Sequence, residues 1–155
     1  MKWIKVVVAT CILGASAMYA DAAKAVYDVT SGDSTKIEKE MIRSIKNVSK
    51  HYKEQHKEFK PIVVISGNAY KYFIEDLAES PYAKEKNVIE IQLKFKPIFK
   101  ELNERYHVTF EMCSAGMKAR GIKKETVYKF VHADKIKDVY LIDAQNEGYA
   151  YMPVH

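Results

Sequence analysis

The 155-residue sequence lacks several features that mark large classes of proteins. It contains no internal repeat, no low-complexity stretch and no linker, which excludes repeat architectures and favours a single domain. After the first 22 residues no apolar run is long enough to cross a bilayer, since a spanning helix needs about 20 apolar residues. Lysines alternate with glutamates and form no basic stripe with interleaved aromatic residues, so we do not expect nucleic acid as a partner.

Motifs for metals, cofactors and nucleotides are also missing. His107 and His132 have no cysteine or histidine partner at metal-ligand spacing, and we interpret them as surface or strand-end residues. There is no glycine-rich dinucleotide fingerprint. Gly116 and Gly121 have phosphate-loop spacing, but Ile122 follows where that motif requires lysine. We therefore expect neither a metal nor a cofactor.

Cysteine is scarce, and one of the two residues, Cys11, lies in a segment that we expect to be removed. MKWIK is a positively charged head, residues 6–20 are apolar and rich in small residues, and ADAAKA has small residues at signal-peptidase spacing. We predict a signal peptide over residues 1–22, a single domain over residues 23–155, and a periplasmic or secreted protein that is free of the membrane after cleavage. Removal lowers the net charge from +5 to +4 and leaves Cys113 without a disulfide partner.

The remaining sequence alternates between strand and helix patterns. Residues 24–30 are rich in β-formers, residues 62–65 form a continuous apolar run opened by Pro61, and residues 107–113 form a third strand candidate. Thr35 and Glu38 form a capping-box pair ahead of an amphipathic helix whose apolar positions continue to Phe59. Shorter helices are expected over residues 69–79 and residues 115–120.

Two segments fit more than one structure. Residues 88–106 fit either a strand or a helix interrupted by Pro97, and we favour the helix. The tail from Asp138 onward fits either a hairpin or a helix followed by a last strand from Tyr149, and the alternation seen earlier favours the second. The predicted fold class is α/β, a three-layer sandwich with a mostly parallel sheet and helices on both faces.

The candidate site lies where two predicted strands end, because ligands of parallel α/β sheets gather at the carboxyl ends of strands. One such segment is Ser66–Asn68, and the other begins at Cys113. A thiolate at a helix start is stabilised by unpaired backbone N–H groups and by the positive end of the helix dipole. Free cysteine also belongs to the residue types most often buried for packing, so a structural role stays open. A cysteine hydrolase would require His107 or His132 beside Cys113.

Four segments resemble the DsrE/DsrF-like sulfur-relay family, in its exported branch: YDVTSGD, IVVISGNAY, FEMCSAGMKARGI and QNEGYAYMPV. Their order and spacing match over residues 24–154. The resemblance implies a parallel α/β sheet with helices on both faces, helix at both ambiguous segments, and assembly into trimers or hexamers. In several members the cysteine after this strand carries a persulfide, and Cys113 is the matching position.

The resemblance and the residues together suggest a sulfur carrier. A thiolate on Cys113 would accept sulfane sulfur from a donor protein or small persulfide and pass it to an acceptor. The alternative is a non-catalytic binding or assembly module in which Cys113 is buried and structural. Six further residues would surround the thiolate as binding groups: Ser114, Gly116, Lys118, Arg120, Gly67 and Asn68.

Overall fold

The computed structural model describes residues 22–155. They form a sheet of five parallel strands in the order β4-β3-β2-β1-β5, with helices packed on it. The strands are β1 (Ala23–Val29), β2 (Phe59–Ile65), β3 (Thr109–Met112), β4 (Val131–His132) and β5 (Ala150–Val154). The predicted α/β class is confirmed, and every strand pair is parallel. Cys11 and the predicted signal peptide, apart from Ala22, lie outside the described residues.

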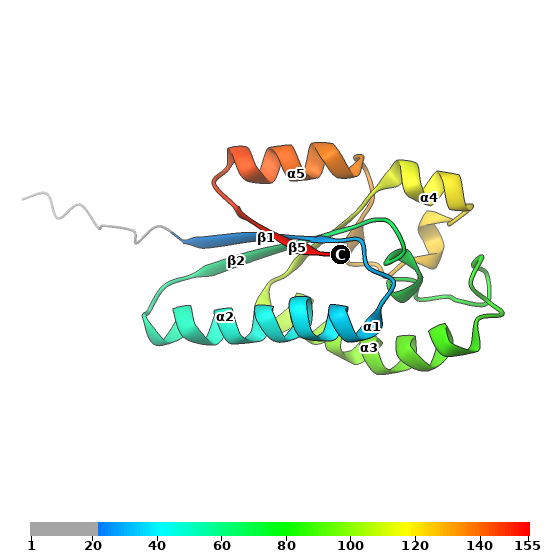
Figure 1. Ribbon diagram of the computed structural model, residues 1–155, viewed down its shortest axis with the longest axis horizontal. Coiled ribbons are helices and arrows are strands. Elements are labelled where there is room, and N and C mark those ends of the chain that lie inside the picture. The colour runs from blue at the N-terminus through cyan, green and yellow to red at the C-terminus, as the bar shows by residue number, and fades with distance from the viewer. Residues whose placement is uncertain (1–21) are drawn as a thin grey trace, which may run out of the picture.

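Helices cover both faces of this sheet (Figure 1). The longer ones are α2 (Arg43–Glu54) and α3 (Lys86–Tyr106) on one face and α5 (Lys137–Asn146) on the other; α4 (Ser114–Arg120) follows β3. Shorter elements are α1 (Ser34–Lys36), the π-helix η1 (Ile37–Ile42) and the 3-10 turns η2 (Tyr70–Tyr72) and η3 (Lys124–Thr126). Within residues 22–155, no helix has the length and apolarity that crossing a bilayer requires.

The two faces of the sheet are buried unequally. Successive side chains of a strand point to opposite faces, so Tyr27 and Val29 enter the large aromatic core beneath α2 and α3. Val26 faces α5 and joins a much smaller cluster with Tyr140 and Ala144. The sheet is thus anchored mainly from the α2–α3 side.

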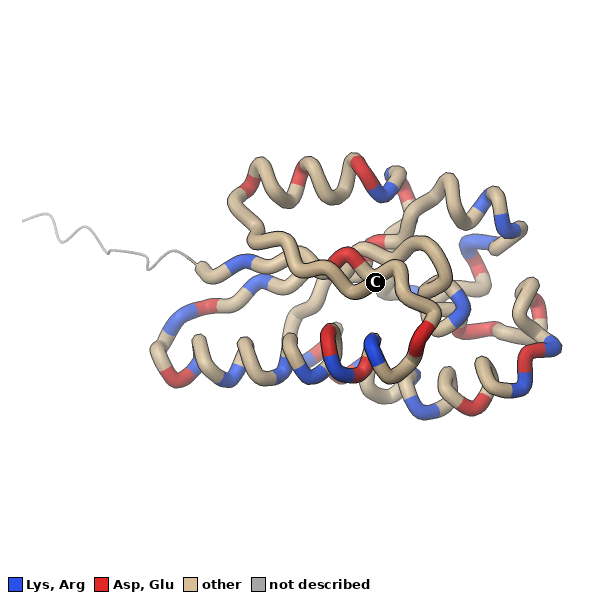
Figure 2. Tube along the Cα trace, in the orientation of Figure 1, with Lys and Arg blue, Asp and Glu red and all other residues tan. Residues whose placement is uncertain are grey.

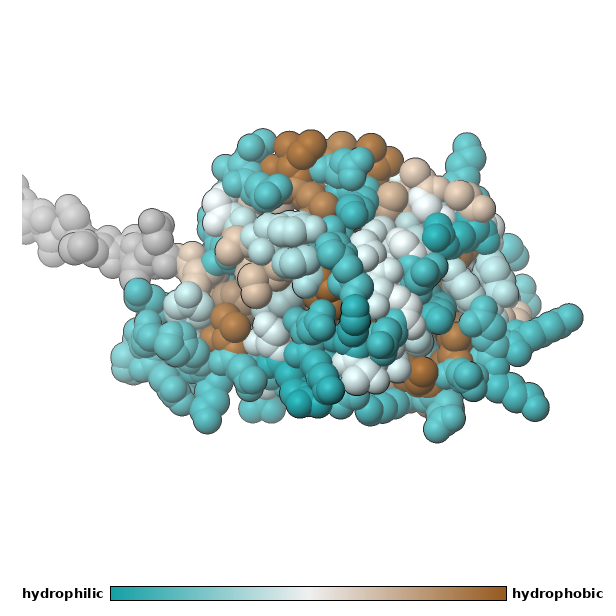
Figure 3. Space-filling model, in the orientation of Figure 1, coloured by the Kyte–Doolittle hydropathy of each residue, from teal (hydrophilic) through white to brown (hydrophobic). Residues whose placement is uncertain are grey.

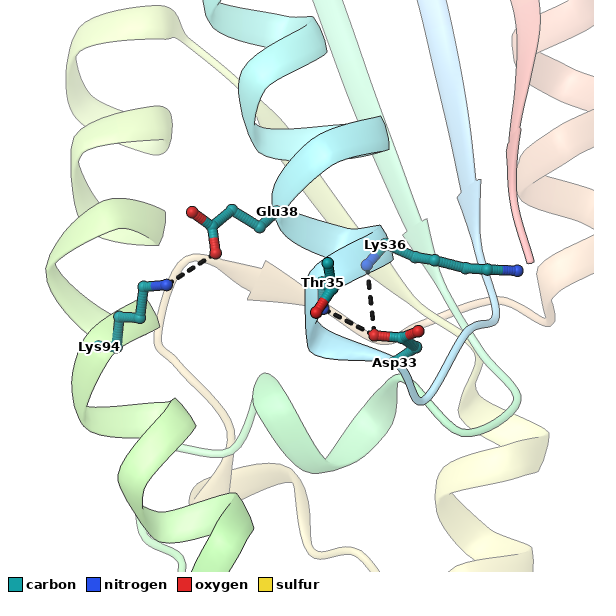
Figure 4. A network of polar contacts seen from close by, with 5 residues as sticks. All are labelled: Asp33, Thr35, Lys36, Glu38 and Lys94. Carbon is teal, nitrogen blue, oxygen red and sulfur yellow. Dashed lines mark hydrogen bonds and ion pairs between the residues drawn. The ribbon is translucent and has the colours of Figure 1, made fainter.

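The first helix begins differently from the capping-box prediction (Figure 4). Asp33, rather than Thr35, is the N-cap, and its carboxylate accepts the backbone N–H of Thr35 at 2.8 Å. Glu38 does not reach back to the cap but pairs with Lys94 of α3 at 2.7 Å. The aspartate caps a helix that begins two residues earlier than predicted, and Glu38 is then free to link two helices.

The predicted helix over residues 69–79 is wrong. Only η2 is helical there, and an isolated bridge joins Ile74 to Val127. The backbone N–H groups of Glu75 and Asp76 donate to the carbonyl of Thr126 at 2.8 and 3.0 Å. Because the segment finds its hydrogen-bond partners in a distant loop, it needs no helical ladder.

The other elements follow the predictions closely. The ambiguous residues 88–106 are helical in α3 with Pro97 inside it, and the tail forms α5 and then β5. The helix predicted to run toward Phe59 ends at Glu54, and Phe59 starts β2. The short strand β4 carries too few residues to leave a pattern, and the sequence did not predict it.

Candidate functional site

The ends of β1, β2 and β3 meet at one edge of the sheet, as the parallel arrangement predicts. The backbone N–H of Cys113 donates to the carbonyl of Ile65 at 3.0 Å, which joins the end of β3 to the end of β2. A Cβ on Gly67 would lie 2.7 Å from the carbonyl oxygen of Thr30, so only glycine allows the loops after β1 and β2 to approach this closely. This edge therefore brings three loops together around short side chains.

Cys113 is the N-cap residue of α4 and lies at the margin of the core. Its backbone is extended, and its carbonyl accepts the N–H of Met117 at 3.1 Å as the first bond of the helix. The residue is 9% exposed. The sequence correctly predicts a cysteine at the start of a helix that Gly121 ends, and Gly121 adopts the left-handed conformation typical of a helix terminus.

Two opposing effects set the pKa of the Cys113 thiol. Burial raises the pKa, because it disfavours the charged thiolate. The nearby backbone N–H groups of Gly116, Lys137 and Ala115 and the Tyr70 hydroxyl lower the pKa, and together they outweigh burial. The net shift is downward, so thiolate is more populated at neutral pH than for an ordinary cysteine.

Tyr70 is the site residue that the sequence analysis missed. Its ring is fully buried, and its hydroxyl donates to the carbonyl of Cys113 at 2.9 Å. A Cβ on Gly116 would lie 1.9 Å from that hydroxyl, so the ring packs directly on α4 at its only glycine. Burial, and then the hydrogen bond to Cys113, raise the pKa of Tyr70 and keep it a donor. An aromatic residue directly after the small-residue loop at β2 was the available signal.

The predicted positive charges lie on the outer side of this site. The Arg120 guanidinium stands 4.9 Å from the centre of the Tyr70 ring, a cation–π contact that places its charge over the tyrosine. Lys118 is exposed on α4. Arg120 thus reaches the cysteine environment through Tyr70.

The remaining predicted residues have other partners. The backbone N–H of Ser114 donates to the carbonyl of Lys135 at 3.0 Å, so within α4 the N–H groups that act on the thiol are those of the following two residues. Asn68 lies against Gly32, on the β1 side of β2, whereas Cys113 adjoins β2 from the β3 side. That Gly67 and Asn68 form a wall of the cysteine site stays a prediction.

A buried carboxylate extends the site toward β1. Asp28 is 2% exposed, and its Oδ2 accepts the Tyr151 hydroxyl at 2.8 Å and the Lys137 ammonium at 3.1 Å. Its Oδ1 is buried and has no hydrogen-bond partner among the described residues. Lys137 links this carboxylate to Cys113, because its side chain pairs with Asp28 while its backbone N–H donates to the thiol. Asp28 left no signal in the sequence beyond a polar residue in a strand.

The histidines considered for a hydrolase lie elsewhere. His107 caps the end of α3 and precedes β3, whereas Cys113 follows β3, so the strand separates them by roughly 20 Å at 3.3 Å per residue. His132 is exposed on β4 and pairs in register with Glu111. Across residues 22–155, no three His, Cys, Asp or Glu side chains gather closely enough to hold a metal ion.

Comparison with known proteins places these features in a wider context. Residues 23–154 match the model of the DsrE/DsrF-like family. An uncharacterized protein of Aquifex aeolicus (strain VF5) is 29% identical over 136 residues, which make up 88% of this chain but only 58% of that relative. The solved structure of MTH1491, a protein of unknown function from Methanobacterium thermoautotrophicum, matches with a TM-score of 0.59 and 18% identity over 84% of this chain and 98% of that one. This last likeness shows the fold alone.

Proposed function

The chain belongs to the DsrE/DsrF-like family, and from this premise we propose that it carries sulfane sulfur as a persulfide on Cys113 and passes it to a partner. One observation carries the proposal. Backbone N–H groups from two helix starts and a buried tyrosine hydroxyl converge on the single described cysteine and lower its pKa. A thiolate is the reactive form in sulfur exchange.

The proposed chemistry consists of two exchanges with no net oxidation. The Cys113 thiolate attacks the outer sulfur of a persulfide donor, forms a new S–S bond, and releases the donor sulfur as a thiolate. The outer sulfur of the resulting Cys113 persulfide is then attacked by an acceptor thiolate, which regenerates the Cys113 thiolate. The N–H groups of Ala115 and Gly116 stabilise the Cys113 thiolate before the first exchange and after the second, with the Tyr70 hydroxyl beside it.

The burial of Cys113 favours a second candidate, a binding or assembly module with a structural cysteine. The residue is 9% exposed and belongs to the core cluster with Met112 and Met117. A buried thiol that only packs would react slowly and would have no need for donors aimed at it. The convergence of donors is the reason to prefer the sulfur carrier.

Mass spectrometry of the native protein after polysulfide treatment separates the two candidates. The carrier gains about 32 Da on Cys113, the mass of one sulfur atom, and loses it to an added thiol acceptor. Cys113→Ser serves as the matched variant and gains nothing. If the untreated and treated proteins have the same mass while the unfolded chain reacts, Cys113 is structural and the proposal fails.

We also propose that the protein is exported and that it self-assembles. The N-terminal pattern supports cleavage near residue 22 and a periplasmic or secreted location, which N-terminal sequencing of the cell-fractionated protein tests.

Self-assembly is supported by an exposed apolar row on α5, formed by Ile136, Val139 and Ile142, which appears brown above α5 in Figure 3. We expect Ile142→Glu to lower the sedimentation coefficient and Leu93→Glu, at an exposed site on α3, to leave it unchanged.

A further inference from the structure

A groove at the opposite edge of the sheet from Cys113 has the charge and shape of a binding site. The groove, of about 550 Å³, is lined by α2, by the start of β2 and by the end of α3. Ala23, the first residue of β1, donates its backbone N–H to Glu58 in this lining, which places the groove at the amino ends of the strands. Five cations line it: Lys46, Lys50, Lys53, Lys57 and Arg105.

The groove holds the whole charge imbalance of the domain. Glu58 is the one carboxylate in its lining, so five cations against one anion give a net charge of +4. The net charge of residues 23–155 is also +4, because the first 22 residues remove two lysines and one aspartate from the total of +5. The rest of the domain is therefore neutral, and Figure 2 shows the cations following one another along α2.

Ion pairs within the domain neutralise only part of this charge. Lys46 and Arg105 share Glu101 at 2.6 and 3.5 Å, and Lys50 lies 4.0 Å from Glu54. The two remaining cations, Lys53 and Lys57, form no ion pair with any residue of the described chain, 22–155. A ligand in the groove would therefore meet two ammonium groups without an ion-pair partner, and three more cations whose charge is only partly neutralised.

Local helix electrostatics account for only some of these residues. Lys53 and Arg105 lie in the last turns of α2 and α3, where cations interact favourably with the helix dipole. Lys46 lies about two turns before the end of α2, and Lys57 lies beyond it, so neither has this reason to be basic. The tertiary fold brings all of them to one groove.

We propose that this groove binds an extended, carboxylate-rich segment of a partner protein. Lys46 to Lys53 covers about 10 Å of helix axis, a length that about three residues of extended chain match. Lys46, Lys50 and Lys53 are spread along this line and Lys57 follows beyond the end of α2, an arrangement that suits an extended anion better than a compact one. Phe59 and Tyr106 also line the groove, and Lys46 and Arg105 lie over the Tyr106 ring.

Because the groove lies at the amino ends of the strands, a partner docked there would not cover Cys113, which lies at the carboxyl ends. Strand β3 separates His107 in the groove lining from Cys113 at the other edge. The inference does not depend on sulfur chemistry, since it rests on charge, volume and position. Its failure and the failure of persulfide formation are separate outcomes.

Fluorescence anisotropy of a labelled octaglutamate peptide at low salt tests the proposal. We expect binding by the purified protein and at least about tenfold weaker binding by Lys53→Glu/Lys57→Glu, since charge complementarity provides the affinity. Lys84→Glu/Lys129→Glu changes the net charge equally at exposed sites outside the groove and should bind within about twofold of the parent. All four positions are exposed, and circular dichroism confirms folding.

Two results would overturn the proposal. In the first, both double variants lose peptide binding equally, which indicates a nonspecific charge effect. In the second, the parent protein binds no peptide; if vesicles containing phosphatidylglycerol then bind the parent but not the groove variant, the groove is assigned to an anionic membrane surface.

Discussion

The two edges of the sheet use different sources of positive potential. At the carboxyl edge, the groups around Cys113 are backbone N–H dipoles and one buried hydroxyl, held in place by α4, α5 and the Tyr70 ring. At the amino edge, the groove presents full charges on flexible, solvated side chains. Fixed dipoles suit the stabilisation of one anionic atom, whereas mobile charges suit recognition of an extended anionic surface. The two proposals thus assign chemistry to the carboxyl ends of the strands and docking to their amino ends.

The largest expected effect comes from disturbing the packing around Cys113 at the carboxyl ends of the strands. Gly116→Ala places a Cβ 1.9 Å from the buried Tyr70 hydroxyl, so the ring or α4 must move. We expect urea unfolding to show a loss of about 1–3 kcal/mol, the usual cost of overpacking. Gly121→Asn is the control, because its Cβ meets no atom within 4 Å and asparagine tolerates the left-handed conformation. Equal losses in both variants would contradict the packing of Tyr70 on Gly116.

Substitution of the buried carboxylate Asp28 should have the next largest effect. Asp28→Asn keeps an acceptor for Tyr151 but removes the charge that holds Lys137, so we expect a loss of about 1 kcal/mol in unfolding free energy. Slower alkylation of Cys113 should accompany it, since Lys137 donates its N–H to the thiol. Lys124→Met breaks an exposed ion pair with Asp134 and should change neither quantity. Unchanged alkylation in the Asp28 variant would separate this carboxylate from the cysteine.

Removal of the Tyr70 hydroxyl measures how much this group lowers the pKa of the Cys113 thiol. Tyr70→Phe removes a hydroxyl that lowers the pKa of the Cys113 thiol, so its pKa should rise. We expect iodoacetamide to alkylate the native variant about fivefold more slowly at pH 7, which corresponds to the net worth of one hydrogen bond. Tyr72→Phe removes a comparable hydroxyl, bound to the carbonyl of Gly32 at 2.7 Å, and should leave the rate unchanged. The same rate in all three proteins would remove Tyr70 from the site.

Salt should distinguish the two edges directly. Raising the ionic strength from about 0.05 to about 0.5 M should weaken octaglutamate binding by about tenfold, because exposed charges are screened. The alkylation of Cys113 by neutral iodoacetamide should change by less than about twofold, since buried dipoles are screened much less. Parallel titrations of one protein sample give both numbers. A strong salt effect on alkylation would show that Arg120 or Lys118, rather than the backbone, controls the thiol.

A pH-dependent effect concerns Glu111, two residues before Cys113. Burial first, and then Asp143 and Glu147, raise the pKa of Glu111 to about 7, against the opposing effect of Lys135. The folded state therefore holds this proton more tightly than the unfolded state, and stability falls as pH rises from about 4.5 through about 7. Glu111→Gln should be more stable than the parent at pH 8 and equally stable at pH 4 in thermal unfolding. An equal difference at both pH values would contradict the raised pKa.

Patterns within a single element were predicted well. The strand runs, the helical periodicity of residues 88–106 and the short helix over residues 115–120 all depend on neighbours in the sequence, and the structure confirms them. The prediction over residues 69–79 was wrong because its backbone pairs with Thr126, more than 40 residues away. The cap is Asp33 rather than Thr35 because the Asp33 carboxylate accepts the backbone N–H groups of Thr35 and Lys36, which starts the helix two residues earlier.

For the candidate site, the sequence by itself determined the position of Cys113 between a strand and a short helix. Strand and helix periods are local, and small residues after a strand allow a tight turn. Only the tertiary structure decided which groups surround the thiol, since Tyr70 and Lys137 come from loops and helices that meet at the sheet edge.

The same holds for the groove. Lys46, Lys50, Lys53 and Lys57 already lie at helical spacing in the sequence, and folding adds Arg105 from α3 to make one positive surface. Charges and side-chain types belong to the sequence. Which of them share a surface depends on how strands and helices pack, because packing brings together residues that lie far apart in the chain.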